Sequence, residues 1–523
     1  MKILLVVPTF RYTEGGALLS ISDFPTGLAY ISSALKKASH EVIGLNLNND
    51  KKYDNPVLLL GNELSRAIEE EKPDLIGVGG LCVDFAFIRD AIETIRQVSA
   101  VPIVMGGRII TNDRDYIFNR LKPDFCIWGD GEETMVQLAD MLEAQGHPNS
   151  IKNLGYWTEE GPVFNETDYN YGDIDTREFP DYEPFGIQSM MDDYSIATRI
   201  LYRYTRPYPR PMTINTARGC PFNCTFCIHR EGPKYRARSI ANIMAEIEQL
   251  YDKYQFNILI IGDELFAADK KRFASFCKAL IGKKKALGWD FDWMFQTHAN
   301  SKLDLDSLEL AKTAGCFFFS YGLESASPKV LKSMNKKSSV EDYLSGIELS
   351  KQVGIGFGGN LLFGDPIETN STIEETLEFW ARHCQDSMVF LAMLMPYPGC
   401  AVFDYCEANG IIPDKDEYYD TIGSTFFNMT KIPVEQFRSW AQFIMKLETT
   451  WMLAKDTKAI SHLIEDTVIS HSPDVSIHKI GSICPHCGDE STYREIWNKE
   501  TEGPLWLGTA CQKCNQRIKV RVG

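Results

Sequence analysis

Three cysteines stand close together in the segment GCPFNCTFC, at Cys220, Cys224 and Cys227. Three thiolates at this C-x3-C-x2-C spacing can bind three irons of a [4Fe–4S] cluster, and no fourth cysteine stands nearby for the last iron. That iron would be free to bind another molecule. Zinc is the structural alternative, but it prefers four ligands in a closed site, and the nearest extra candidate is His229. The spacing therefore favours a cluster with an open position.

A second group of cysteines lies near the C-terminus, at Cys484, Cys487, Cys511 and Cys514. Two C-x2-C pairs about two dozen residues apart have the spacing of a zinc ribbon. Four thiolates complete a tetrahedron, so the metal is expected to be structural and to fold a segment with little core. Rubredoxin-like iron is the alternative, because the same ligands can hold iron. His486 favours neither metal.

The chain has fourteen cysteines, and half of them fall into these two groups. Metal-ligand spacing in place of a disulfide pattern suits a reducing compartment, and we expect a cytoplasmic protein. The other cysteines are scattered and are expected to be buried small hydrophobic residues. They are Cys82, Cys126, Cys277, Cys316, Cys384, Cys400 and Cys406.

The elements that position the first cysteine group follow an alternating strand and helix pattern, so the predicted fold class is α/β. Residues 1–145 predict a Rossmann-like, doubly wound parallel sheet, in which ligands bind beyond the carboxyl ends of the strands. Glycines at those ends would let a bulky ligand approach the backbone, although tight turns would also explain them. The candidate positions are Gly79, Gly80, Gly106, Gly107, Gly129 and Gly131, followed by Glu132.

The remainder of the chain divides by its pattern into four further segments. Residues 146–210 predict a linker, and residues 211–430 predict a partial (β/α)6 barrel whose first strand leads into the cysteine loop. One barrel helix begins after Ser239, a plausible N-cap. Residues 431–475 predict a helical segment, and residues 476–523 the zinc-ribbon-like domain. The predicted barrel strands are 212–216, 258–261, 293–297, 317–320, 359–363 and 388–393.

From the cysteine motif onward the chain resembles the radical S-adenosylmethionine (SAM) superfamily, and more narrowly its cobalamin-binding branch, over residues 1 to about 430. The resemblance implies that SAM binds the open iron and is cleaved to a 5′-deoxyadenosyl radical. It also implies SAM contacts at particular positions behind the cysteines. These are Phe226, Gly262, Asp263, Glu264, Glu324 and Gly364.

The same resemblance implies that the N-terminal sheet binds cobalamin, with Gly27 and the strand-end glycines standing where the branch has similar runs. The better-known corrinoid pattern is Asp-x-His-x-x-Gly, whose histidine binds cobalt. Here the only nearby histidine is His40, which lacks the Asp and has the wrong glycine spacing, and we expect it at the surface. Bound cobalt should therefore have no protein histidine below it.

The implied reaction is methyl transfer to an unactivated carbon or a phosphorus of a small-molecule or lipid precursor, with an electron donor such as flavodoxin or ferredoxin. A radical SAM cyclase or oxidoreductase that uses cobalamin differently or not at all is the second possibility. A transfer-RNA methylthiotransferase would need three N-terminal cluster cysteines, and only Cys82 and Cys126 occur there. A non-catalytic metal-binding interaction protein is the alternative from another class.

The overall charge limits the classes of molecule that the protein is expected to bind. A formal charge of −17 makes nucleic acid an improbable partner, because phosphate binding requires concentrated Lys and Arg. No apolar stretch reaches the roughly 20 residues of a membrane span. Substrate contacts are expected around Arg203, Tyr204 and Arg206, or in the helices after Gly399, but no spacing there encodes a substrate class.

Overall fold

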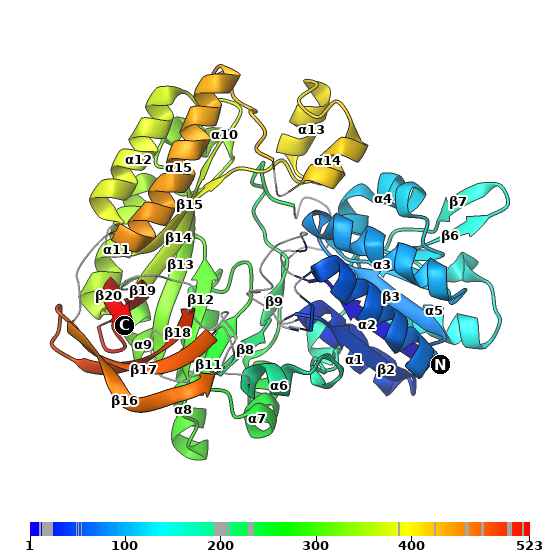
Figure 1. Ribbon diagram of the computed structural model, residues 1–523, viewed down its shortest axis with the longest axis horizontal. Helices are drawn as coiled ribbons and strands as arrows, with labels where there is room; N and C mark the ends of the chain where they lie inside the picture. Colours follow the sequence, from blue (N-terminus) through cyan, green and yellow to red (C-terminus); the bar gives the residue numbers. More distant parts are fainter. Residues whose placement is uncertain are drawn as a thin grey trace. The chain divides into compact units, whose positions relative to one another are not determined.

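The computed structural model describes residues 1–523 except 10–11, 13–24, 49, 51, 54, 193–205, 207–209, 229–234, 385–386, 423–424, 455–459, 472–474, 499–504, 515–516 and 523. The chain forms two compact units (Figure 1). The first consists of Met1–Met190, Cys227–Arg236 and Pro396–Thr425, and the second of Met191–Phe226, Ala237–Met395 and Phe426–Gly523.

The first unit is built on a sheet in the order β2-β1-β3-β4-β5-β6-β7, whose first five strands are parallel. These strands are β1 (Lys2–Val7), β2 (Glu41–Asn46), β3 (Leu75–Gly79), β4 (Ile103–Gly106) and β5 (Phe125–Ile127). The connecting helices are α1 (Thr26–Lys37), α2 (Pro56–Glu71), α3 (Phe85–Val98), α4 (Arg108–Leu121) and α5 (Glu132–Glu143). The predicted Rossmann-like sheet is confirmed, and its strand order reverses direction between β1 and β3, where such folds bind ligands.

The predicted linker contains two further strands of this sheet, β6 (Leu154–Thr158) and β7 (Gly161–Phe164), which pair antiparallel after β5. Their hairpin turns at Gly161, whose φ is +126°. Trp157 stacks on Phe118 of α4, with ring centroids 4.8 Å apart. Both strands are largely half-exposed, so they lack the buried apolar run by which the other strands were predicted. The rest of the segment includes α6 (Ile187–Asp192).

His40 corrects another expectation, because it is buried and not at the surface. Only 4% of the residue is exposed, and its Nε2 lies 3.1 Å from Oδ1 of Asp140 on α5. The ring therefore packs between the end of α1 and α5, beside Met1 at the amino ends of β1 and β2.

The second unit contains an all-parallel sheet in the order β8-β11-β12-β13-β14-β15, which confirms the predicted partial barrel (Figure 1). The strands are β8 (Pro211–Ile214), β11 (Ile258–Ile261), β12 (Asp292–Thr297), β13 (Cys316–Glu324), β14 (Gly356–Phe363) and β15 (Met388–Met393). Two short strands, β9 (Ala217–Arg218) and β10 (Arg236–Ala237), stand before and after the cysteine loop in sequence.

The barrel helices are α7 (Ile240–Tyr254), α8 (Lys270–Leu287), α9 (Leu305–Thr313), α10 (Pro328–Ser333), α11 (Val340–Val353) and α12 (Asn370–His383). Ser239 caps α7 as predicted, since its hydroxyl accepts the backbone N–H of Asn242. The helix buries Ile243, Ile247 and Leu250 on one face. These apolar side chains therefore form part of the hydrophobic core.

The barrel ends earlier than residue 430. The segment Pro396–Thr425, with α13 (Ala401–Ala408) and α14 (Lys415–Thr421), belongs to the first unit. Nζ of Lys415 lies 2.9 Å from Oδ2 of Asp113 on α4, and the Tyr419 hydroxyl donates to the same oxygen at 2.9 Å. The contacting residues stand 302 and 306 positions apart in the chain, so local periodicity could not reveal these contacts.

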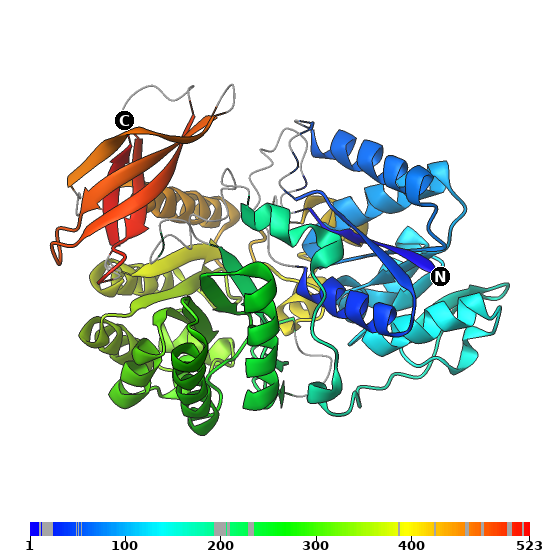
Figure 2. The same ribbon diagram turned by 90° about the horizontal axis from the view of Figure 1, so that it is seen from below.

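Among the described residues of the predicted helical segment 431–475, only α15 (Val434–Ala454) is helical. It is followed by a long strand, β16 (Ile460–His471), which pairs with β17 (Val475–Ile483), and β17 pairs in turn with β18 (Glu490–Asn498). β19 (Leu505–Ala510) and β20 (Arg517–Val522) form a separate hairpin, and β16 contacts β20 (Figure 2). The C-terminal β domain thus begins at residue 460, earlier than the predicted 476.

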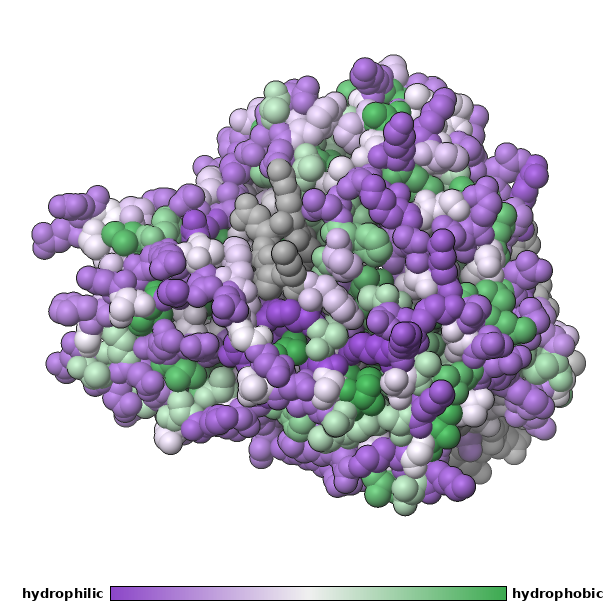
Figure 3. All heavy atoms as spheres, turned by 180° about the vertical axis from the view of Figure 1, so that it is seen from behind, coloured by the Kyte–Doolittle hydropathy of each residue, from purple (hydrophilic) through white to green (hydrophobic). Residues whose placement is uncertain are grey.

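Hydrophilic side chains cover most of the face seen in Figure 3, and hydrophobic residues form small separate patches there. Among the described residues, no helix is long and apolar enough to cross a membrane.

Candidate active site

The three motif cysteines lie on the loop that follows β8 and β9, and each is half-buried. Residues after α10 fasten this loop. The backbone N–H of Thr225 donates to the carbonyl oxygen of Met334 at 3.0 Å, and the Asn335 amide donates to the carbonyl oxygen of Asn223 at 2.8 Å. Three thiols held half-exposed on one anchored loop suit a cluster that must also contact a ligand.

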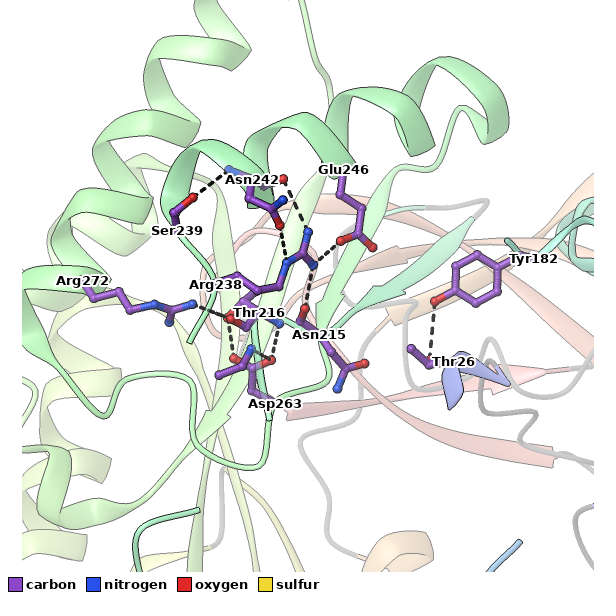
Figure 4. A network of polar contacts seen from close by, with 11 residues as sticks. Thr26, Tyr182, Asn215, Thr216, Arg238, Ser239, Asn242, Glu246, Asp263 and Arg272 are labelled. Carbon is purple, nitrogen blue, oxygen red and sulfur yellow. Dashed lines mark hydrogen bonds and ion pairs between the residues drawn. The ribbon is translucent and has the colours of Figure 1, made fainter. Parts of the chain in front are cut away.

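Asp263 fixes the start of the same loop from inside the protein (Figure 4). Its Oδ1 accepts the backbone N–H groups of Thr216 at 2.5 Å and Ala217 at 3.1 Å, and its Oδ2 accepts the Thr216 hydroxyl. Burial raises the pKa of Asp263 to about 6. These bonds engage both carboxylate oxygens, so Asp263 positions the start of the loop, and its contact with SAM stays a prediction. Its neighbour Glu264 is exposed.

A buried ion pair supports Asn215, the residue before Thr216 (Figure 4). Arg238 and Glu246 form this pair with side-chain exposures of 3% and 0%. The Arg238 guanidinium also donates to the backbone oxygen of Asn215 at 2.8 Å and to Oδ1 of Asn242 at 2.6 Å. Together with Asp263, this network holds the chain between β8 and the cysteine loop.

Glu324 ends β13 with a φ of +66°, a strained conformation for a residue with a side chain. Its Oε1 accepts a hydrogen bond from Nζ of Lys336 at 3.0 Å, and the two side chains are 9% and 6% exposed. Lys336 directly follows the residues that fasten the cysteine loop. The predicted polar group, the Glu324 carboxylate, is therefore present at this strand end and forms an ion pair with Lys336.

The turn after β14 holds two buried carboxyl groups. The N–H of Gly364, at φ +118°, donates to Oε2 of Glu368, while Oδ1 of Asp365 accepts the Ser333 hydroxyl at 2.7 Å. Burial raises the pKa of Glu368 to about 8. Oε1 of Glu368 and Oδ2 of Asp365 are buried without a partner among the described residues.

His298, directly after β12, is a residue that the sequence reasoning missed. Its ring stacks on Phe222 of the cysteine loop, with centroids 4.2 Å apart, and the residue is 6% exposed. Nδ1 accepts the N–H of Asn300, so the neutral ring carries its hydrogen on Nε2, which has no partner among the described residues. Burial lowers the pKa of His298 to about 3. The sequence signal that could have identified His298 was its position directly after a predicted barrel strand.

Most of the predicted cobalamin glycines have a packing reason in the first unit. A Cβ on Gly107, whose φ is +88°, would lie 2.6 Å from the backbone oxygen of Gly80, and a Cβ on Gly79 would meet the backbone of Gly106. Gly129 packs against Tyr171 in the same way. Gly106 differs, because the nearest atom to a Cβ there would lie 3.8 Å away.

Three other predicted positions of this set are Gly27, Gly131 and Glu132. Gly27 lies in α1, and a Cβ there would meet no atom within 4 Å. Gly131 caps α5, and Glu132 begins that helix with only 5% exposure. Among the described residues, an added methyl group would therefore meet no close contact at Gly27 or Gly106.

Of the remaining predicted residues, Arg206 anchors the chain before the barrel, and three others lie outside the described residues. Arg206 forms hydrogen bonds to Asp290 and Asp292, each at 2.8 Å, which anchor the chain before β8. Arg203, Tyr204 and His229 lie outside the described residues. Phe226 is half-buried in the cysteine loop, and Gly262 directly follows β11.

The four cysteines near the C-terminus lie together in the structure. Their sulfur atoms all lie within 4.8 Å of one another, and the residues are Cys484, Cys487, Cys511 and Cys514.

Two known domains match the two halves of this arrangement. Residues 24–139 match the B12 binding domain, and residues 214–379 match the radical SAM superfamily. The first match covers β2 to β5 with their helices, and the second covers the cysteine loop and the strand ends up to α12. Neither match includes the C-terminal β domain.

Relatives of this chain come from several organisms. An uncharacterized methyltransferase of Pyrococcus horikoshii is 25% identical over 419 residues, which are 79% of this chain and 84% of the relative. An anaerobic magnesium-protoporphyrin IX monomethyl ester cyclase of Cereibacter sphaeroides is 25% identical over 432 residues, which are 79% of this chain and 66% of the relative.

A solved structure shares the fold. It is the radical SAM methyltransferase TsrM from Kitasatospora setae, solved with cobalamin and a [4Fe–4S] cluster bound, with a TM-score of 0.60 and 18% identity. The similarity covers 79% of this chain and 75% of that one. At this identity it supports the architecture alone.

Proposed function

We propose that this chain, which belongs to the radical SAM superfamily and carries a B12 binding domain, is a cobalamin-dependent methyltransferase that acts on a small molecule. The three-thiol loop supports this proposal most directly. It offers a cluster three protein ligands and leaves one iron for SAM. When bound, the cluster, SAM and cobalamin supply the radical and the methyl group, and the protein must hold and shield them.

The proposed work of the second unit is to hold SAM against the loop. Glu264, exposed beside the network of Asp263, is the acidic group that we propose for the SAM amine. The Nε2–H of His298 and the free oxygens of Asp365 and Glu368 are buried polar groups for which a polar ligand would provide partners. Phe226, Glu324 and Gly364 complete the proposed set.

The proposed work of the first unit is to hold cobalamin at the carboxyl ends of β1, β3 and β4. Gly106 has no close contact at its Cβ position, and the backbones of Gly79 and Gly106 and of Gly80 and Gly107 approach each other closely at that edge. His40 is turned away into the packing between α1 and α5. We therefore propose that cobalt is bound without a histidine from this chain.

The products formed from SAM distinguish methyl transfer from other outcomes. The anaerobically reconstituted, reduced protein would be incubated with SAM, with and without hydroxocobalamin, and both nucleoside products quantified. A methyltransferase should form S-adenosylhomocysteine only when cobalamin is bound. If 5′-deoxyadenosine forms but S-adenosylhomocysteine never does, the methyl-transfer proposal is wrong.

A radical SAM cyclase or oxidoreductase is the second candidate, and the cyclase relative of Cereibacter sphaeroides favours it. In that case 5′-deoxyadenosine would be the main product of SAM. A non-catalytic metal-binding protein would form neither product.

We also propose that a small electron-transfer protein such as flavodoxin or ferredoxin reduces the cluster, since the reaction consumes electrons. None of the fourteen cysteines, all of which the structure describes, forms a disulfide. This suits a reducing compartment such as the cytoplasm.

A further inference from the structure

The C-terminal β domain brings four cysteines together from two separate turns. Cys484 and Cys487 lie between β17 and β18, and Cys511 and Cys514 lie between β19 and β20. Sγ of Cys484 is 3.8 Å from Sγ of Cys514, and Sγ of Cys487 is 3.6 Å from Sγ of Cys511. A tetrahedral zinc ion with Zn–S bonds of about 2.3 Å requires sulfur atoms roughly 3.8 Å apart. The four thiols therefore already have the spacing of a metal site.

The two turns resemble each other in their backbone hydrogen bonds. The N–H of His486 donates to Sγ of Cys484 at 3.4 Å, and the N–H of Lys513 donates to Sγ of Cys511 at 3.4 Å. Gly488, at φ +72°, closes the first turn by donating its N–H to the carbonyl oxygen of Cys484. N–H groups aimed at sulfur stabilise thiolates, which are the form that binds a metal.

We propose that Cys484, Cys487, Cys511 and Cys514 hold one structural Zn²⁺ that joins the β16-β17-β18 sheet to the β19-β20 hairpin. Each of the two sheets contributes one C-x2-C turn. The ion therefore cross-links two sheets whose strands do not pair with each other. Four thiolates fill the tetrahedron and leave no position for water or substrate. The site is therefore structural and distinct from the open cysteine loop.

The small size of this domain explains why it would need a metal. Its described buried side chains include the apolar Ile480 and Ile518 but also the polar Ser482 and Ser491. A domain of about 60 residues buries a limited apolar area and is marginal without a metal or another cross-link. Metal binding would supply the missing folding free energy.

Zinc suits the site better than iron for two reasons. A site of given ligands binds zinc more tightly than ferrous iron in the general order of divalent metals. In addition, Cys487 is exposed, and a solvent-accessible thiolate ligand is better matched to an ion without redox chemistry. Iron at this site is the outcome that the experiment must exclude.

The domain connects to the barrel through α15. Phe437 on this helix lies beside Gly364 of the turn after β14, and the Trp440 indole donates to Oδ1 of Asn370 at 2.9 Å. The same helix contacts β19. The zinc site therefore stabilises a domain packed on the barrel without touching the cysteine loop.

The test is metal analysis of full-length protein purified without reconstitution, before and after removal of one metal site. The triple variant Cys220→Ala, Cys224→Ala, Cys227→Ala lacks the cluster ligands but keeps the C-terminal thiols. We expect about one zinc per chain in both wild type and triple variant, matching a single tetrathiolate site. Iron in place of zinc in the triple variant, or no bound metal there, would overturn the proposal.

The reciprocal variant is Cys487→Ser with Cys514→Ser, which removes one ligand from each turn. It should lose the zinc, become sensitive to proteolysis after α15, and still take up cluster iron on reconstitution. A Cys384→Ala variant, which removes a buried thiol outside both groups, should keep its zinc. Retention of zinc by the double variant would contradict the assignment, and the triple variant decides the question if the double variant does not fold.

Discussion

At the scale of single residues, neighbouring side chains on one strand end have opposite tasks. Asp263 turns inward because the N–H groups of Thr216 and Ala217 need a buried acceptor, and Glu264 turns outward. The sequence placed both acids at the correct strand end. It could not assign their roles, since Thr216, a main partner of Asp263, stands 47 residues earlier in the chain.

Exchanging each acid for its amide should separate these roles. Asp263→Asn places an amide against donor groups, and we expect a loss of about 2 kcal/mol of stability together with less reconstituted iron. Glu264→Gln should keep the melting temperature and iron content but weaken SAM binding. Thermal unfolding, iron analysis and SAM titration test both changes, and equal effects on stability would contradict the assignment.

Glu368 should give the protein a distinct pH dependence of stability. Its pKa is raised from 4.5 to about 8 by burial, so between these values the folded state holds a proton that the unfolded state has lost. Stability from this group is therefore present at low pH and lost as the pH rises toward 8. Replacing Glu368 by Gln removes this dependence, because the amide does not titrate.

As the pH rises from about 5 to about 8, the free energy of unfolding of Glu368→Gln should increase relative to that of wild type by on the order of 3 kcal/mol. Denaturant unfolding at several pH values measures it, with Glu374→Gln on the exposed face of α12 as the control. A constant difference between variant and wild type at every pH would show that Glu368 is ionised in the folded protein.

At the scale of elements, buried apolar parallel strands were predictable and half-exposed antiparallel strands were not. The six barrel strands read as buried apolar runs, and β15 was predicted with its observed bounds. β6 and β7 are largely half-exposed and show no such run. β16 was predicted as helix because only its pairing with β17, later in the chain, makes it a strand. The docking of α14 on α4 likewise depends on contacts distant in sequence.

Two neighbouring glycines at the end of β4 provide a prediction at this scale. Gly107→Ala puts a Cβ 2.6 Å from the Gly80 oxygen at a φ of +88°, and we expect a loss of roughly 1–3 kcal/mol. Gly106→Ala meets no atom closer than 3.8 Å, so it should keep its stability and lose bound cobalamin. Thermal unfolding and cobalt analysis measure the two effects. Full cobalt retention by Gly106→Ala would place the cofactor elsewhere.

At the scale of the whole molecule, the chain combines two cysteine groups of different design. The loop at residues 220–227 offers three half-buried thiols, and the C-terminal group offers four thiols that close on one another. Sequence spacing alone separated these two classes, because the number of ligands decides whether a metal keeps an open position. The contacts that hold the cysteine loop, such as the bond from Thr225 to Met334, join residues distant in the chain, and no spacing encodes them.

The central claim is that the cysteine loop carries a cluster that cleaves SAM. The most direct measurement is 5′-deoxyadenosine formed from SAM by the reconstituted protein under anaerobic conditions with a strong reductant. Wild type and the control Cys384→Ala should form it, and Cys224→Ala should not. If wild type with a full complement of iron and sulfide forms none, or if Cys224→Ala forms as much as wild type, the claim is wrong.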